Sequence, residues 1–89
     1  MEGDMETKDL LAERAKTHGD YRVHAEVTQR LKDYIHARDA WSRMNPSQRE
    51  ALDMICHKIG RIIAGNANFK DHWDDIAGYA KLVADQCLA

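Results

Sequence analysis

The sequence has few of the residues that interrupt helices and few of those that cross-link small folds. Proline occurs once and glycine five times in 89 residues, so long uninterrupted helices are allowed. The only two cysteines, Cys56 and Cys87, lie in apolar segments with helical spacing, which predicts free thiols packed in a core. This low cysteine content is atypical of secreted, disulfide-bonded domains, and we therefore expect a cytoplasmic protein.

Two further absences narrow the classes of partner. No apolar run approaches the roughly 18 residues that a membrane-spanning helix needs, so we expect no membrane partner. Neither sign of charge dominates, because 13 Lys and Arg stand against 15 Asp and Glu, and the two are interleaved. Proteins that bind nucleic acid usually gather their bases on one face, so nucleic acid is not an expected partner.

What the chain does contain is apolar residues at helical spacing. We expect one helical domain over residues 1–89, in which residues 1–6 form a disordered tail. No β-alternation is present, so the predicted fold class is all-α, either a four-helix antiparallel bundle or a set of helical hairpins. The four predicted helices cover residues 7–17, 21–42, 47–64 and 69–88.

Capping residues support these boundaries. Thr7 is a candidate cap for the first helix, and Gly19 with Asp20 ends that helix and caps the second. Asn45 or Ser47 caps the third helix, in which Ser47 and Glu50 have the spacing of a capping box. Pro46 suits its first position. The candidate caps of the fourth helix are Asn66 and Asn68.

The apolar stripes of these helices are narrow. In the second helix Val27, Leu31 and Ile35 recur every four residues on an otherwise polar rod. Aromatic and aliphatic side chains outside the stripes add apolar surface that so small a chain covers poorly; they are Tyr34, Trp41, Tyr79 and Leu82. We therefore expect self-association as a homodimer or homotetramer.

Carboxylates gather on the third and fourth predicted helices. Glu50 and Asp53 share one helix face, and Asp71, Asp74 and Asp75 open the next helix at positions i, i+3 and i+4. Mg²⁺ takes oxygen ligands, commonly a few carboxylates together with substrate phosphates. The three aspartates of the fourth helix are therefore candidate metal ligands, and Glu50 and Asp53 are candidate catalytic residues.

The same acids have a purely structural interpretation, which the spacing alone favours. They lie opposite the apolar stripes, where carboxylates usually form a solvated face, and aspartates in a first turn offset the helix dipole. Antiparallel packing brings Lys58 and Arg61, rather than Glu50, close to the start of the fourth helix. Lys58 and Arg61 are thus the candidate phosphate-binding residues. Both acid groups would meet only with help from a neighbouring subunit.

Three other features have competing interpretations. Five histidines are present, but without a His-x3-His pair or a Cys-x2-Cys motif no zinc site is expected, and His57 is the best metal candidate among them. Tyr21 either packs against the fold or stacks on a base. Gly78, in the middle of a helix, costs about 1 kcal/mol relative to alanine, which suggests either close helix or ligand approach there or chance.

Three stretches carry a family resemblance. Residues 13–21 contain the sequence HGDY, residues 50–61 contain EALD, and residues 71–80 read DHWDDIAGYA. Together they resemble a family of small phage and prophage proteins without an assigned activity. That family is distantly similar to the MazG-like all-α nucleotide pyrophosphohydrolases, which are oligomeric and bind Mg²⁺ through two pairs of acids on successive helices.

The resemblance implies which residues would form these pairs. The matching positions are Glu50 with Asp53, and Asp71 with Asp74 or Asp75; two of the four acids differ in identity from the MazG-like pattern. The leading hypothesis is a phage-type helical protein that binds a nucleotide with Mg²⁺, with or without hydrolysis of a nucleoside triphosphate, in the bacterial cytoplasm. The alternative is a non-enzymatic protein–protein interaction module.

Overall fold

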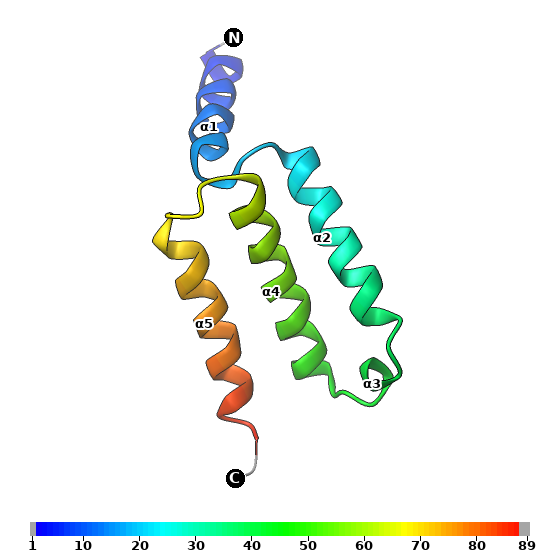
Figure 1. The fold of residues 1–89 in the computed structure, drawn as a ribbon. Helices are drawn as coiled ribbons and strands as arrows, with labels where there is room; N and C mark the ends of the chain where they lie inside the picture. The colour runs from blue at the N-terminus through cyan, green and yellow to red at the C-terminus, as the bar shows by residue number, and fades with distance from the viewer. Residues whose placement is uncertain (1, 88–89) are drawn as a thin grey trace.

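The computed structural model describes residues 2–87, with side chains from residue 7 onward. Within this range the chain forms helices and no strand, which confirms the all-α class. Five helices follow one another along the chain (Figure 1). They are α1 (Glu2–His18), α2 (Tyr21–His36), α3 (Asp39–Ser42), α4 (Pro46–Ala64) and α5 (Lys70–Ala84).

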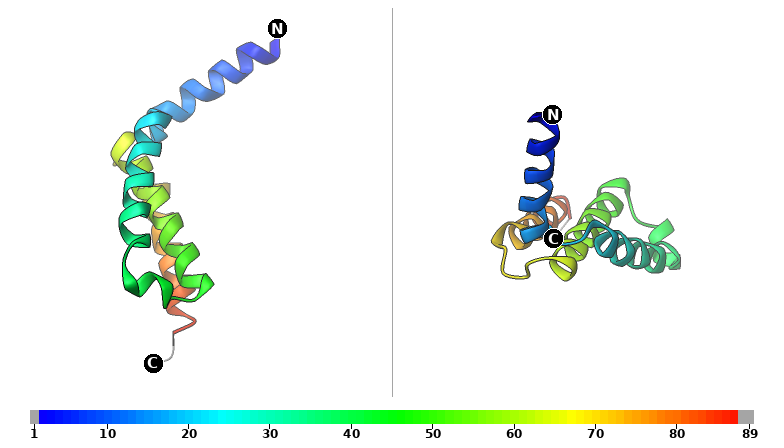
Figure 2. Two further views of the ribbon diagram at one scale, coloured as in Figure 1. Left: turned by 90° about the vertical axis from the view of Figure 1, so that its right-hand side faces the viewer. Right: turned by 90° about the horizontal axis from the view of Figure 1, so that it is seen from above.

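Three of these helices form a single flat layer. α4 lies in the middle, with α2 packed along one side and α5 along the other (Figure 1). α1 projects from one end of the layer at a steep angle and touches α2 and α4 only near its C-terminus (Figure 2). Of the two predicted arrangements, the helical hairpins are correct, and the four-helix bundle is wrong because α1 does not pack along the other helices.

The layer has a small core. Among the described residues only three hydrophobic side chains are fully buried, namely Ala51, Cys56 and Ile62 on α4. The predicted apolar stripes of α2 and α4 are mostly half-buried, and Trp73 on α5 is 53% exposed. A single layer gives each helix neighbours only on its sides, so the apolar residues on its open faces keep much of their contact with solvent.

The helices α2 and α4 approach each other closely at Gly60 of α4. A Cβ atom at this position would lie 2.2 Å from Oγ1 of Thr28 and 2.8 Å from Nδ1 of His24, both on α2. Both α2 residues are buried, and neither of these two atoms has a hydrogen-bond partner within the described chain. The absence of a side chain at Gly60 therefore sets the distance between α2 and α4.

Three predicted helix boundaries are wrong. The helix predicted to run to residue 88 ends at Ala84. α1 begins at Glu2, so Thr7 lies inside the helix and does not cap it. The helix predicted to run from residue 21 to residue 42 ends at His36, and a separate turn of helix, α3, contains Trp41. The Trp41 ring packs on the His36 ring with 4.3 Å between the ring centroids. No glycine or proline marks this break, so local sequence signals did not reveal it.

The caps are partly as predicted. Asp20 caps α2 by accepting a 2.8 Å hydrogen bond from the Arg22 amide. α4 is capped by Asn45, whose capping-box partner is Gln48, so the pairing predicted between Ser47 and Glu50 is wrong. Because Pro46 occupies the first position of α4, Ser47 already lies inside the helix.

At α5 the N-cap is Phe69, which makes no side-chain capping bond, rather than Asn66 or Asn68. The Asn66 side chain instead accepts a 2.9 Å hydrogen bond from the Asn68 amide in the preceding turn.

The two cysteines differ in their surroundings. Both are free thiols, as predicted; Cys56 is buried and Cys87 is exposed beyond the end of α5, so the predicted core packing is right for Cys56 alone. Burial raises the pKa of the Cys56 thiol, with a further contribution from the nearby Asp53 carboxylate. None of the helices in the described range is long and apolar enough to cross a membrane.

Candidate functional site

The structure places the predicted acids in separate local pairs. His36 Nε2 donates to Asp53 Oδ1 at 2.6 Å, across α2 and α4. Lys58 Nζ lies 2.9 Å from Asp75 Oδ2, across α4 and α5. This ion pair lowers the pKa of the Asp75 carboxyl group. Asp74 pairs along its own helix with Lys70. Each of these carboxylates therefore already has a neighbouring base.

The remaining acids do not complete a metal site. Asp71 is exposed at the start of α5, and Glu50 lines a groove beside Tyr79 near the other end of the hairpin. Among the side chains that the structure describes, those of residues 7–87, no three His, Cys, Asp or Glu residues are grouped so that they would hold a metal ion. Within one chain, the predicted Mg²⁺ ligands thus do not fit a common ion, and His57 is not part of such a group either.

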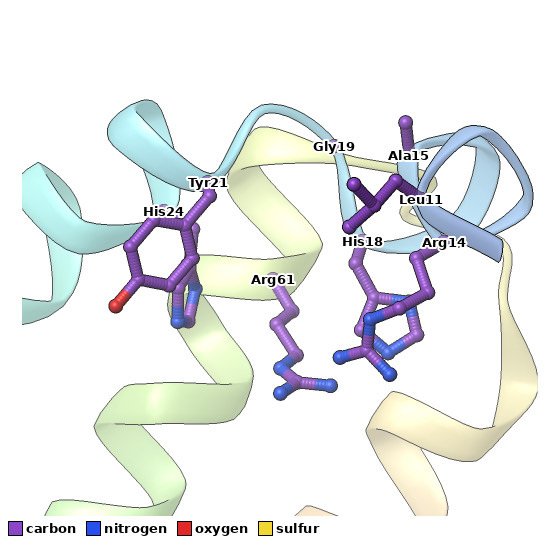
Figure 3. A pocket seen from close by; sticks show the side chains of 8 residues that line it. All are labelled: Leu11, Arg14, Ala15, His18, Gly19, Tyr21, His24 and Arg61. Carbon is purple, nitrogen blue, oxygen red and sulfur yellow. The ribbon is translucent and has the colours of Figure 1, made fainter. Parts of the chain in front are cut away.

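A different set of residues does converge, in a cleft of about 300 Å³ below the projecting α1. We call it the arginine cleft. The C-terminal half of α1, the start of α2 and the last turns of α4 form its walls (Figure 3). Its lining consists of Leu11, Arg14, Ala15, His18, Gly19, Tyr21, His24 and Arg61.

Two guanidinium groups dominate the electrostatics of this cleft. Arg14 reaches it from α1 and Arg61 from α4, and their guanidinium groups face the same space (Figure 3). Burial and the positive charge of Arg14 lower the pKa of Arg61. Within the described chain, neither arginine forms an ion pair with a carboxylate, although Asp75 is near enough to Arg61 to favour its charge. The cleft therefore contains concentrated positive charge without a bound counter-charge.

The histidines of the cleft respond to this charge. Burial, and then the positive charges of Arg61 and Arg14, lower the pKa of His18 to about 4. Burial and Arg61 also lower the pKa of His24, whose ring meets that of His57 edge-on at 4.5 Å between centroids. At neutral pH both cleft imidazoles are uncharged, and Nδ1 of His18 pairs with Oγ1 of Thr17.

The junction between α1 and the layer is held by hydrogen bonds to the Thr17 carbonyl and by a close approach of two backbone segments. His72, which is 1% exposed, donates from Nε2 to the carbonyl oxygen of Thr17 at 3.0 Å. The Asn66 amide donates to the same carbonyl at 3.1 Å. Gly19 adopts a φ of 76°, and a Cβ there would lie 1.9 Å from the Ala64 carbonyl oxygen. The glycine is thus required both for the left-handed turn and for the close approach of the two chain segments.

The sequence prediction found part of this cleft. Arg61 was predicted to bind phosphate and does line it, whereas its predicted partner Lys58 is engaged with Asp75. Arg14 and His18 were missed as site residues. A signal for them exists, because Leu11, Arg14, Ala15 and His18 follow the i, i+3, i+4, i+7 spacing of one helix face, so an arginine and a histidine share a face with apolar residues.

Fold and site together define a small all-α protein with a cationic cleft at the junction of three helices. The chain belongs to the family described as "Domain of unknown function (DUF6378)", whose model matches residues 5–87. No curated protein and no solved structure matches the chain.

Proposed function

We propose that this protein binds a nucleotide, or a closely related phosphorylated ligand, in the arginine cleft. The observation that carries the proposal is that Arg14 and Arg61 face one cleft without a carboxylate partner among the described residues. Guanidinium groups bind phosphate oxygens through paired, charge-assisted hydrogen bonds. A bound phosphate would also remove the repulsion between the two arginines.

Several other arginines on this chain have local partners, unlike the two cleft arginines. Arg30 lies 3.1 Å from Glu26 on the exposed side of α2. Arg49 donates to the backbone carbonyls of Trp41 and Ser42. Arg61 stands in the last turn of α4, where the negative end of the helix dipole stabilises a cation before any ligand binds.

Tyr21 supports a nucleotide rather than a phosphate ion alone. Its side chain lines the cleft and is 77% exposed, so its ring is available to a ligand. Stacking of a base on an exposed aromatic ring contributes about 1–3 kcal/mol.

The other parts of the leading hypothesis stay predictions. The separated acids do not support Mg²⁺ binding within one chain, so the proposal is a binding function, and cleavage of the α–β phosphate bond stays a prediction. The resemblance to MazG-like pyrophosphohydrolases and to small phage proteins is the reason for testing nucleotides first.

A thermal-shift screen with nucleoside mono-, di- and triphosphates, each with and without Mg²⁺, tests the proposal directly. A ligand at 100 times its Kd adds about 2.7 kcal/mol of stability, which raises the Tm measurably. We expect a shift with nucleotides that does not require Mg²⁺. No shift with any nucleotide or with pyrophosphate would contradict the proposal and favour the protein–protein interaction module instead.

Charge-matched variants then locate the site. Arg14→Gln and Arg61→Gln should each weaken binding at least tenfold, since a hydrogen bond to a charged group contributes about 1.5–3 kcal/mol. Arg30→Gln removes the same charge from an exposed ion pair outside the cleft and should leave the Kd unchanged. Tyr21→Ala should weaken the binding of nucleotides but not the binding of pyrophosphate, which has no base to stack on the ring. Equal effects of all three arginine variants would indicate a non-specific response to charge.

A further inference from the structure

The two open faces of the helical layer differ in chemistry. Contacts fix the orientation of α4, because Gly60 faces α2 and Lys58 reaches Asp75 on α5. Arg61 points to the side from which α1 projects, since it lines the arginine cleft together with Arg14. Charged side chains therefore mark the α1 side of the layer.

The opposite side of α4 is occupied by aliphatic residues. Leu52, Ile55, Ile59 and Ile63 recur at steps of three and four, half a helical turn away from Arg61. The first three are half-buried, and Ile63 is 63% exposed. From α2, Val27 and Leu31 belong to the same side, because His36 and its partner Asp53 occupy the other. We call these six residues the apolar face.

A groove on the same side of the layer as the apolar face is also lined without charged residues. Leu52 and Ile55 line a hollow of about 330 Å³ between α4 and α5, and none of the residues lining it is charged. The remaining lining residues are Met44, Gln48, Ala51, Ala80 and Val83. Contiguous apolar surface of this kind on a small protein marks an interaction site.

The chain exposes more surface than a compact monomer of its mass. A compact monomer of 10.2 kDa exposes about 5,300 Å², whereas this chain exposes 6743 Å². Its radius of gyration is 15.7 Å, against about 12 Å for a compact domain of this length. The excess of about 1,400 Å² comes both from the projecting α1 and from the open faces of the layer, and an interface of standard size takes about 800 Å² from each partner.

We propose that the apolar face packs against the same face of a second copy of this chain, in a two-fold symmetric dimer. Domains are stable when two layers enclose one core, and a second copy supplies the missing layer. A two-fold interface brings each face against itself, which a face without charged side chains permits without repulsion. The chain buries few hydrophobic residues of its own, so it needs a partner to cover its apolar face. A second copy of the same chain is such a partner, because it is present whenever the chain is made.

The dimer leaves the arginine cleft open. The cleft and α1 lie on the charged side of the layer, so the interface neither blocks nor completes the proposed nucleotide site. The two proposals therefore fail separately: loss of nucleotide binding says nothing about the dimer, and a monomeric protein says nothing about the cleft.

Sedimentation equilibrium of the full chain, with a matched pair of variants, tests the interface. Ile63 and Leu82 are almost equally exposed, at 63% and 61%, but Leu82 shares a groove with Asp75 on the α1 side of α5. We expect a wild-type mass of about twice 10.2 kDa, and Ile63→Lys should weaken the dimer at least 100-fold. Leu82→Lys should leave the dimer constant unchanged. An assembly that Leu82→Lys disrupts and Ile63→Lys does not would overturn the proposal.

A second measurement needs no variant and so does not depend on whether Ile63→Lys folds. The Tm of a dimer that dissociates on unfolding rises with protein concentration, whereas the Tm of a monomer does not. We expect the wild-type Tm to rise over a hundredfold range of concentration. A monomeric mass together with a constant Tm would mean that the apolar face is not covered by a second copy.

Discussion

The Nε2 atom of His72 donates a hydrogen bond to the carbonyl oxygen of Thr17, across 55 residues of sequence, and so ties α5 to the end of α1. His72 is the most deeply buried large side chain described. Together with the Asn66 amide and the close approach of Gly19 to Ala64, this bond holds the end of α1, which carries Arg14 over the arginine cleft.

Replacing His72 should therefore affect both stability and binding. His72→Phe keeps an aromatic ring, of slightly larger volume, but leaves the part-buried Thr17 carbonyl with one donor fewer, at a cost of about 1–3 kcal/mol in the free energy of unfolding. Nucleotide affinity should fall as well, because Arg14 is no longer held in place. Urea unfolding and titration calorimetry measure the two effects. Unchanged unfolding would show that the hydrogen bond contributes nothing to the junction.

The two mid-helix glycines should respond to alanine in opposite directions. At Gly60 the new methyl group would collide with buried Thr28 and His24, so Gly60→Ala should lower the free energy of unfolding by about 1–3 kcal/mol. At Gly78 a Cβ meets nothing within 4 Å, so Gly78→Ala should raise it by up to about 1 kcal/mol. Chemical denaturation of both variants measures these two changes in the free energy of unfolding. Stabilisation at Gly60 would mean that α2 and α4 are not in such close contact.

The start of α4 offers a test of the observed cap against the predicted one. Asn45→Ala removes the side chain that accepts from the Gln48 amide at 2.8 Å, and should cost about 1 kcal/mol. Ser47→Ala, two residues later, removes a side chain that makes no capping bond and should have little effect. The comparison requires only the shift in urea midpoint of each variant. A larger loss at Ser47 would restore the capping box predicted from the sequence.

The folded protein should lose stability in mild acid. His18 and His57 both have pKa values lowered to about 4, mainly by burial, against an ordinary value of 6.5. Between pH 6.5 and pH 4 the unfolded chain therefore binds protons that the folded chain does not. The free energy of unfolding should fall as the pH falls through this window, by up to about 1.4 kcal/mol per pH unit for each proton.

Variants identify the groups responsible for this pH dependence. His18→Gln and His57→Gln should each flatten the slope of stability against pH between pH 6.5 and pH 4. Urea unfolding at half-unit pH intervals gives that slope. If stability stayed constant from pH 7 to pH 5 in the wild type, these imidazoles would be protonated as readily in the folded state as in the unfolded state.

The comparison of prediction and structure is clearest at particular residues. Apolar spacing and turn residues correctly gave the all-α class, and the local cap at Gly19 and Asp20 is as predicted. Signals of this kind act within one or two helical turns, so the sequence contains them directly. The break after His36 was not predicted, because it depends on Trp41 packing on His36 and on Arg49 of α4 binding nearby carbonyls.

The candidate site, like the fold, was predicted in part from the sequence and is in part visible only in the tertiary structure. The sequence by itself determined helices with narrow apolar stripes, and it singled out Arg61 as a candidate phosphate-binding residue. Only the tertiary structure decided that Asp53 pairs with His36 and Asp75 with Lys58, and that Arg14 joins Arg61 in one cleft. Spacing along a helix fixes which side chains share a face. Which faces meet depends on how closely helices approach, and here that is set by the missing side chain of Gly60 and by the bond from His72 to Thr17.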